Sequence, residues 1–202
     1  MKRFLITLIA LQLVVAMGCA NTSSRQYSKE MLAAKARSEK VIKELDTSAA
    51  PVLGPVYKEF LEALLEDDIE KAWGMVSRAG QQYFTTLPEK HREYNPGMMD
   101  KLEDDKKRLH AMKEANAPED AIIFLEYDIA MNEALLKANS GQDVLRAFAF
   151  KFQRLCLNGM EVAGEQIEGN KGRLTIRTQD PRDRDKNRLD FIKENGVWKL
   201  AK

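Results

Sequence analysis

The stretch RLDFIKENGVWKL at residues 188–200 decides the fold class of this chain. Asn195-Gly196 is the preferred dipeptide of a two-residue type I′ turn, because both turn positions need a positive φ. A two-residue turn pairs Phe191 with Leu200 and sets the register of the whole hairpin. The apolar residues of the hairpin therefore share one face, which helices elsewhere in the chain must cover: Leu189, Phe191, Trp198 and Leu200.

A second hairpin is predicted just upstream of the first. Residues 160–168 and 173–178 have strand character and flank a loop, Gly169-Asn170-Lys171-Gly172, whose composition is typical of a turn. Residues 179–187 form a polar loop of mixed charge between the two hairpins. The C-terminal region is therefore predicted to be an antiparallel sheet.

Most of the chain between residues 25 and 157 is predicted to be helical, because apolar residues recur every three or four positions. The predicted helices lie at residues 25–46, 52–65, 69–79, 98–115, 118–136 and 142–157. Gly80 is the expected C-cap of the third helix, and residues 81–96 are expected to be irregular. The alternation in FAFKF at 148–152 leaves a strand open as an alternative there.

The fold class that follows is α+β, with helical N-terminal and central segments packed on a C-terminal antiparallel sheet. Three segments are expected: a signal peptide at 1–18, a tether and spacer helix at 19–50, and an α+β domain at 51–202. Ser23 or Ser24 could cap the start of the weakly amphipathic helix at 25–46. This helix either holds the domain away from the membrane or docks on it.

The N-terminus has the three parts of an export signal. Lys2 and Arg3 precede a 14-residue run, Phe4 to Met17, that only Thr7 and Gln12 interrupt. A membrane-spanning helix needs roughly 20 apolar residues, so this run is too short to span and instead has the length of a signal-peptide core.

The residues AMGC at 16–19 resemble the lipobox of bacterial lipoproteins. The resemblance implies cleavage after Gly18, a diacylglycerol thioether on the Cys19 sulfur and an acyl chain on its amine. Several chains hold a protein firmly to a bilayer, at about 0.8 kcal/mol per buried CH₂. Ala20 resembles the outer-membrane sorting signal of enteric-type lipoproteins, which implies the periplasmic face of the outer membrane. The alternative is ordinary cleavage near Ala20, which would release a soluble periplasmic protein.

Two further segments resemble the nuclear-transport-factor-like (cystatin-like cone) superfamily of small lipoproteins. YKEFLEALLEDDIEKAW at 57–73 is similar to that family's opening pair of helices, and NRLDFIKENGVWKL at 187–200 is similar to its final hairpin. Residues 97–157 are longer and more helical than the family's middle region. The resemblance therefore implies a cone-shaped fold with a helical insertion.

Aromatic residues in the predicted helices and strands are candidates either for lining a pocket or for plain core: Phe60, Trp73, Tyr127, Phe191 and Trp198. Enzymes of the cone superfamily act through a buried carboxylate, tyrosine or histidine. Tyr57, Tyr127 and Asp128 are the residues that could face such a pocket, although no motif carries a role onto them. With Cys19 acylated, Cys156 is the one remaining thiol and is expected to be buried.

Other chemistry is not indicated by the sequence. The two histidines, His91 and His110, lack metal-ligand spacing, so we expect no metal and no cofactor. Removing Lys2 and Arg3 changes the net charge of +1 to −1, which does not suggest a nucleic-acid partner. The favoured function is a non-catalytic, membrane-anchored envelope protein that binds a protein partner or a small apolar ligand. The alternatives are an isomerase- or dehydratase-type enzyme of the cone superfamily and an assembly subunit of an envelope complex.

The first testable prediction concerns the lipid anchor. Replacing Cys19 with Ala removes the sulfur that would carry the diacylglycerol, so the variant should accumulate as an unmodified precursor. Intact-mass measurement of membrane-extracted wild-type protein should show acyl mass on Cys19. A soluble, unacylated wild type that begins at Ala20 or later would contradict the prediction.

Overall fold

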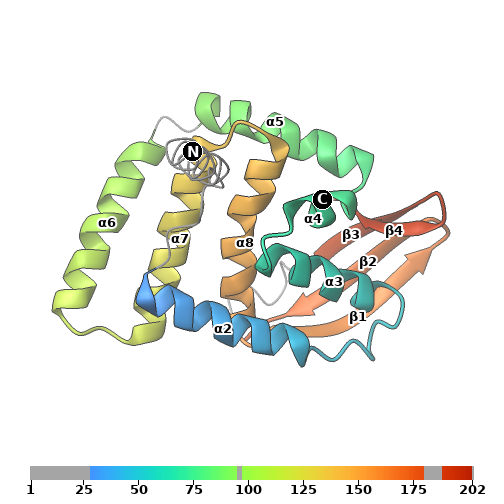
Figure 1. Cartoon of the computed structure of the whole chain (residues 1–202), viewed down its shortest axis with the longest axis horizontal. Coiled ribbons are helices and arrows are strands. Elements are labelled where there is room, and N and C mark those ends of the chain that lie inside the picture. The colour runs from blue at the N-terminus through green and yellow to red at the C-terminus, as the bar shows by residue number, and fades with distance from the viewer. Residues whose placement is uncertain (1–27, 95–96, 180–187, 202) are drawn as a thin grey trace, which may run out of the picture.

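The computed structural model describes residues 28–94, 97–179 and 188–201, and these ranges hold helices packed against a C-terminal antiparallel sheet (Figure 1). This confirms the predicted α+β class. The elements in chain order are α2 (Lys29–Lys43), α3 (Leu53–Leu65), α4 (Ile69–Gly74), α5 (Arg78–Tyr94), α6 (Met98–Glu114), α7 (Glu119–Lys137), α8 (Gly141–Leu157), β1 (Glu161–Glu168), β2 (Lys171–Arg177), β3 (Arg188–Glu194) and β4 (Val197–Leu200).

The four strands form a meander in the order β1-β2-β3-β4. The final hairpin has the predicted register, with Phe191 opposite Leu200, and its turn residues Asn195 and Gly196 have φ values of 52° and 83°. The β1–β2 turn is shorter than the predicted loop. Glu168 pairs directly with Lys171, so the turn holds only two residues.

The predicted irregular segment at 81–96 was wrong, because α5 runs through most of it. Pro88 lies inside α5, and Phe84 and Leu87 on the same helix are buried. Gly80 belongs to α5 and is not a C-cap. A Cβ at Gly80 would lie 2.5 Å from the carbonyl oxygen of Ala201, so close packing against the end of the chain requires glycine there. Burial of the face with Phe84 and Leu87 against other helices offsets the loss of the backbone hydrogen bond that Pro88 cannot donate.

Helix α4 ends at Gly74, earlier than predicted, because the chain leaves it to pair with β4. The amide of Leu200 donates to the carbonyl oxygen of Met75 at 2.9 Å. The amide of Ser77 donates to the carbonyl oxygen of Leu200 at 2.8 Å. These bonds attach the break between α4 and α5 to the edge of the sheet.

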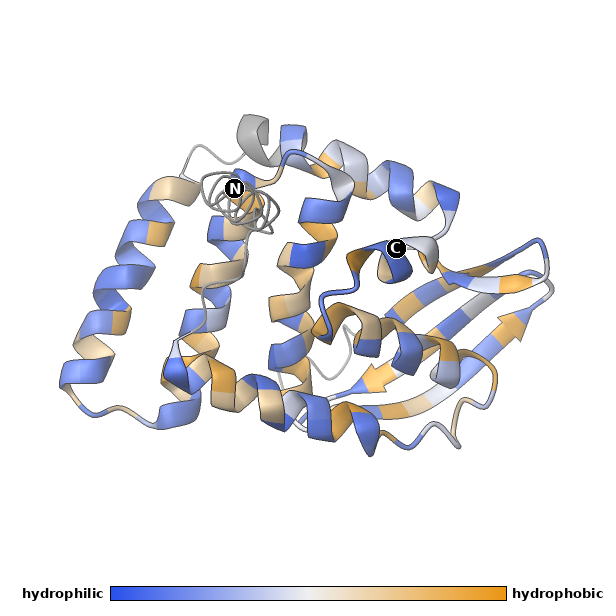
Figure 2. Cartoon of the chain, viewed as in Figure 1, coloured by the Kyte–Doolittle hydropathy of each residue, from blue (hydrophilic) through white to orange (hydrophobic). Residues whose placement is uncertain are grey.

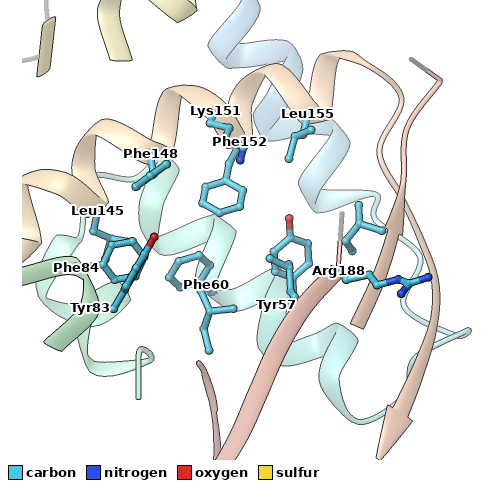
Figure 3. A pocket seen from close by; sticks show the side chains of 13 residues that line it. Tyr57, Phe60, Tyr83, Phe84, Leu145, Phe148, Lys151, Phe152, Leu155 and Arg188 are labelled. Atoms are coloured by element: carbon cyan, nitrogen blue, oxygen red, sulfur yellow. The ribbon is translucent and has the colours of Figure 1, made fainter. Parts of the chain in front are cut away.

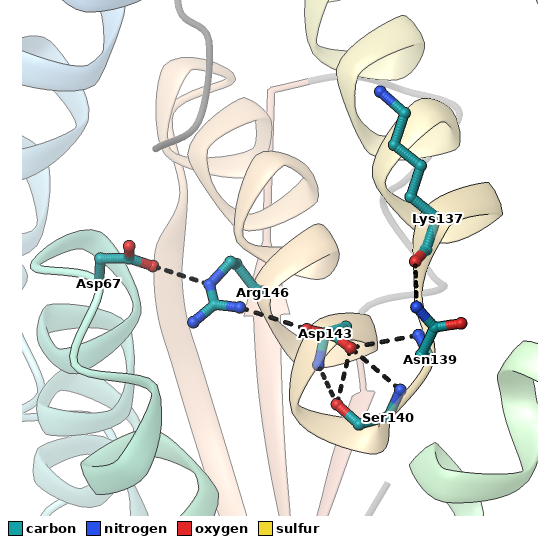
Figure 4. Close-up of polar contacts among 6 residues, drawn as sticks. All are labelled: Asp67, Lys137, Asn139, Ser140, Asp143 and Arg146. Atoms are coloured by element: carbon teal, nitrogen blue, oxygen red, sulfur yellow. Dashed lines mark hydrogen bonds and ion pairs between the residues drawn. The ribbon is translucent and has the colours of Figure 1, made fainter. Parts of the chain in front are cut away.

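Residues 142–157 form a helix, so the strand alternative at 148–152 is wrong. Ser140 and Asp143 form a capping box at the start of α8, and the side chain of Asp143 also contacts Arg146 at 3.3 Å (Figure 4). Arg146 reaches in turn to Asp67 at the break between α3 and α4, also at 3.3 Å. The cap starts the helix, and the ion pair between Arg146 and Asp67 attaches it to the break between α3 and α4.

Helices α6, α7 and α8 lie side by side, with α5 and α2 crossing the ends of α7 and α8, and α3 lies on the sheet (Figure 1). The main core lies between the sheet and helices α3, α4, α5 and α8. A second cluster joins α2, α7 and α8, and a third joins α6 to α7. Most of α6 is hydrophilic (Figure 2), and its buried Met98 and Leu102 belong to its apolar stripe.

Helix α2 docks on the domain and does not stand apart from it. Met31, Ala34, Ser38 and Ile42 are buried, mainly where α2 meets α8. Ser28 caps the helix by accepting from the amide of Met31 at 3.1 Å. The packed unit therefore begins before residue 51. The predicted caps Ser23 and Ser24 lie outside the described residues.

Helix α3 takes its N-terminal cap from the sheet. The Glu165 carboxylate on β1 accepts from the amide of Leu53 at 2.7 Å and from that of Val52 at 3.1 Å. Val52 itself has no capping side chain. A carboxylate at a helix N-terminus also interacts favourably with the helix dipole. This contact, between residues 112 positions apart, holds α3 against the sheet.

The second testable prediction uses the final turn. Gly196 has a φ of 83°, and a Cβ there would meet nothing within 4 Å, so only backbone conformation opposes a side chain. Gly196→Ala should lower the free energy of unfolding by about 1 kcal/mol or more. The matched control is Gly74→Ala, because Gly74 has open space and no positive φ. Chemical denaturation of both variants checks this, and equal stabilities would contradict it.

A candidate apolar binding cavity

An apolar cavity of about 240 Å³ lies between α3, α5 and α8 and the inner face of the sheet (Figure 3). Thirteen residues line it: Tyr57, Phe60, Tyr83, Phe84, Leu145, Phe148, Lys151, Phe152, Leu155, Ile176, Arg188, Leu189 and Leu200. It reaches the surface where Tyr83, Lys151 and Arg188 are exposed. A cavity lined in this way suits an apolar ligand.

The helices place the lining residues by their 3.6-residue period. Leu145, Phe148 and Phe152 follow one face of α8 at spacings of three and four. Tyr57 and Phe60 do the same on α3, which faces α8 across the cavity. The sheet closes the far side, because alternate residues of β2, β3 and β4 point toward the helices.

Edge-to-face contacts among the rings shape the cavity. The Phe60 and Phe152 ring centroids lie 5.8 Å apart at 88°, and those of Tyr57 and Phe152 lie 6.4 Å apart at 66°. On the other side, Phe84 and Phe148 lie 5.8 Å apart at 64°. This geometry is favourable for aromatic pairs and fixes the rings in place.

Tyr57 is the buried polar residue of the lining. Its hydroxyl donates to the Sδ atom of Met160 at 3.5 Å, and a thioether sulfur is a weak acceptor. Burial, together with the neighbouring Cys156 thiol, raises the pKa of Tyr57 well above its ordinary value. The interior therefore offers little polar interaction to a ligand.

Two cations and no acids are found among the residues that line the cavity within the described ranges. Lys151 lies on α8, and Arg188 begins β3. Both lie at the edge of the group of rings in Figure 3, where Arg188 extends away from them. Asp128, which sequence reasoning considered for a pocket, does not line this one. It binds Arg154 at 2.7 Å.

Of the five aromatic candidates, only Phe60 lines this cavity. Trp73 lies behind the lining, with its ring centroid 6.4 Å from that of Phe84. Tyr127 packs in the second core cluster with Met31 and Phe150, and Phe191 and Trp198 belong to or border the main core. Trp198 covers Gly172, where an added Cβ would approach the indole to 3.3 Å. The structure does not bring the five together around one pocket.

Sequence reasoning missed the rings that α5 and α8 contribute. The i, i+4 pair Phe148 and Phe152 was a usable signal for one aromatic face on a helix. Tyr83 and Phe84 lie in the segment that was predicted to be irregular, so the helix that presents them was missed.

Within the same described ranges, no three histidine, cysteine, aspartate or glutamate side chains gather as a metal site would require. His110 is exposed on α6 and lies 3.2 Å from Glu114, while the side chain of His91 lies outside the part described. No helix in the described part is sufficiently long and apolar to cross a bilayer.

Comparisons with protein-family models, with curated proteins and with solved structures return no match for this chain. The resemblances to the lipobox and to the cone superfamily therefore stay predictions.

The third testable prediction concerns Cys156, which is 1 % exposed. Burial raises the pKa of its thiol from an ordinary 9.0 to about 12, so the reactive thiolate is nearly absent at pH 8. Iodoacetamide should leave Cys156 unmodified in the native protein and alkylate it fully in denaturant, as peptide mass will show. Ala111→Cys on the exposed face of α6 supplies a thiol that should react in the native state. Native labelling of Cys156 at the rate of that control would contradict the prediction.

Proposed function

We propose that this chain is a lipid-anchored envelope protein whose domain binds a small apolar ligand without transforming it. The observation that carries the proposal is the aromatic cavity between α3, α5, α8 and the sheet. Six of its lining residues are aromatic: Tyr57, Phe60, Tyr83, Phe84, Phe148 and Phe152.

The volume of the cavity supports a small ligand. An apolar cavity of about 150 Å³ holds one benzene ring, so scaling to 240 Å³ suggests a ligand of about ten non-hydrogen atoms. Burying such a ligand among fixed rings is favourable by the hydrophobic effect and costs little reorganisation.

The character of the lining supports binding over catalysis. General acid–base catalysis needs a carboxylate, histidine or similar group positioned against the substrate. The lining residues in the described ranges include neither a carboxylate nor a histidine, and the buried Tyr57 hydroxyl contacts a methionine sulfur. This arrangement favours the binding domain over the isomerase- or dehydratase-type alternative.

The surface of α6 bears on the assembly-subunit alternative. An apolar strip along residues 98–112, if exposed, would have favoured it. Met98 and Leu102 are buried, and Leu109 and Met112 pack toward α7 in the third core cluster. Met99 is exposed, but the rest of this face is occupied within the chain.

The anchor belongs to the same proposal. Because α2 docks on the domain, a lipid on Cys19 would be nine residue steps along the chain from Ser28, the N-cap of α2. Nine residue steps reach at most about 30 Å. An acylated Cys19 would therefore hold the cavity near the membrane, on the periplasmic face of the outer membrane if Ala20 is read as a sorting signal.

The fourth testable prediction fills the cavity. Leu189 lines it from β3, so Leu189→Trp should occupy part of its volume and abolish binding of 1-octanol. We expect wild type to bind 1-octanol with a dissociation constant of about 0.1–1 mM. Isothermal titration of the full-length protein in nanodiscs, with empty nanodiscs as the blank, provides the measurement.

The matched control is Ile192→Trp, on the same strand but on the opposite face of the sheet. It should keep the affinity of wild type, and thermal unfolding should show that both variants are folded. No binding by wild type, or equal binding by both variants, would contradict the proposed function.

A further inference from the structure

The charges around the cavity indicate a class of ligand, and this step rests on the proposed function. We infer that the cavity takes an amphiphilic monocarboxylate, whose apolar body of about ten atoms lies among the rings and whose anionic group lies at the rim beside Lys151. The apolar lining of the interior would not hold the anionic group, whereas the cations Lys151 and Arg188 at the rim would.

The first support is the pairing of cations along α8. Arg146 contacts Asp67 and Asp143, and Arg154 contacts Asp128. Lys151 lies between these arginines, and the described residues give it no ion pair. The two flanking cations of this helix are thus neutralised within the chain, whereas the one that lines the cavity is left for an external anion.

The second support is the sign of the lining charge. Arg188 also lines the cavity, and it likewise has no acidic partner among the residues described. Two positive charges without a counter-charge favour an anion at the rim and disfavour a cation. Because both side chains are exposed, each contributes modestly and in a salt-dependent way.

The third support is the polarity of the interior. Placing a carboxylate in an apolar site without hydrogen-bond donors is costly. The buried polar group of the lining, the Tyr57 hydroxyl, already donates to Met160 and is surrounded by rings. A charged head is therefore expected to stay at the rim, in contact with water and Lys151, while the apolar body enters.

The test compares three eight-carbon probes that differ in their head groups: octanoate, 1-octanol and octylammonium. Titrations use the full-length protein in nanodiscs at pH 8, where octanoate is ionised and octylammonium is charged. Wild type should bind octanoate most tightly and octylammonium least tightly. Raising the salt from about 0.02 M to 0.5 M should reduce the difference between octanoate and octanol.

Lys151→Gln should weaken octanoate binding about threefold more than it weakens octanol binding. Lys151→Gln combined with Arg188→Gln should remove the preference for octanoate. The matched control is Arg108→Gln, which removes the same charge from the exposed face of α6, away from the cavity. It should leave all three affinities unchanged, and empty nanodiscs correct for partitioning into lipid.

The outcomes separate this inference from the proposed function. If octanol binds in a manner sensitive to Leu189→Trp, but octanoate binds no better than octanol or is unaffected by Lys151→Gln, the inference is overturned and the proposed function stands. Tightest binding of octylammonium would also overturn it. If no probe binds wild type, both fail.

Discussion

Helix α8 is buried on two opposite sides, and the arrangement of the other elements depends on that constraint. One side, with Val144, Leu145 and Cys156, faces the main core, whereas Phe150 faces the second cluster with α2 and α7. A helix that is apolar on two sides cannot lie at a surface, so both flanks need cover. The sheet with α3 and α4 covers one flank, and α7 with α2 covers the other.

The same constraint produces the cavity. Phe148 extends from α8 toward α5 and contacts Phe84 edge to face. Phe152 extends toward α3 and contacts Phe60 in the same way. Aromatic pairs prefer such edge-to-face arrangements, so the rings surround the space between α3, α5 and α8 in a defined geometry. The cavity is thus a consequence of using aromatic residues where α8 meets its neighbours, and its opening lies where the exposed Lys151 leaves α8.

Turn chemistry and apolar periodicity predicted the local structure correctly where long-range packing did not oppose them. The turn at Asn195-Gly196 and its register followed from backbone conformation alone. Helix α5 was missed because Pro88 lies inside it and argues against a helix, although the buried Phe84 and Leu87 follow a helical spacing. The residues that line the cavity were predicted less accurately, because the identity of an aromatic residue does not indicate which core cluster its ring joins. Phe60 lines the cavity, and Tyr127 packs elsewhere.

The sequence by itself determined the α+β class, the final hairpin and most helices, since periodicity and turn chemistry are properties of neighbouring residues. Tertiary structure alone decided which rings surround one cavity and that Glu165 caps α3. It also decided that Arg146 and Arg154 pair with acidic residues, whereas Lys151 has no acidic partner among the described residues. These contacts join residues far apart in the chain. Such contacts exist only once burial has brought the elements together, so no local pattern encodes them.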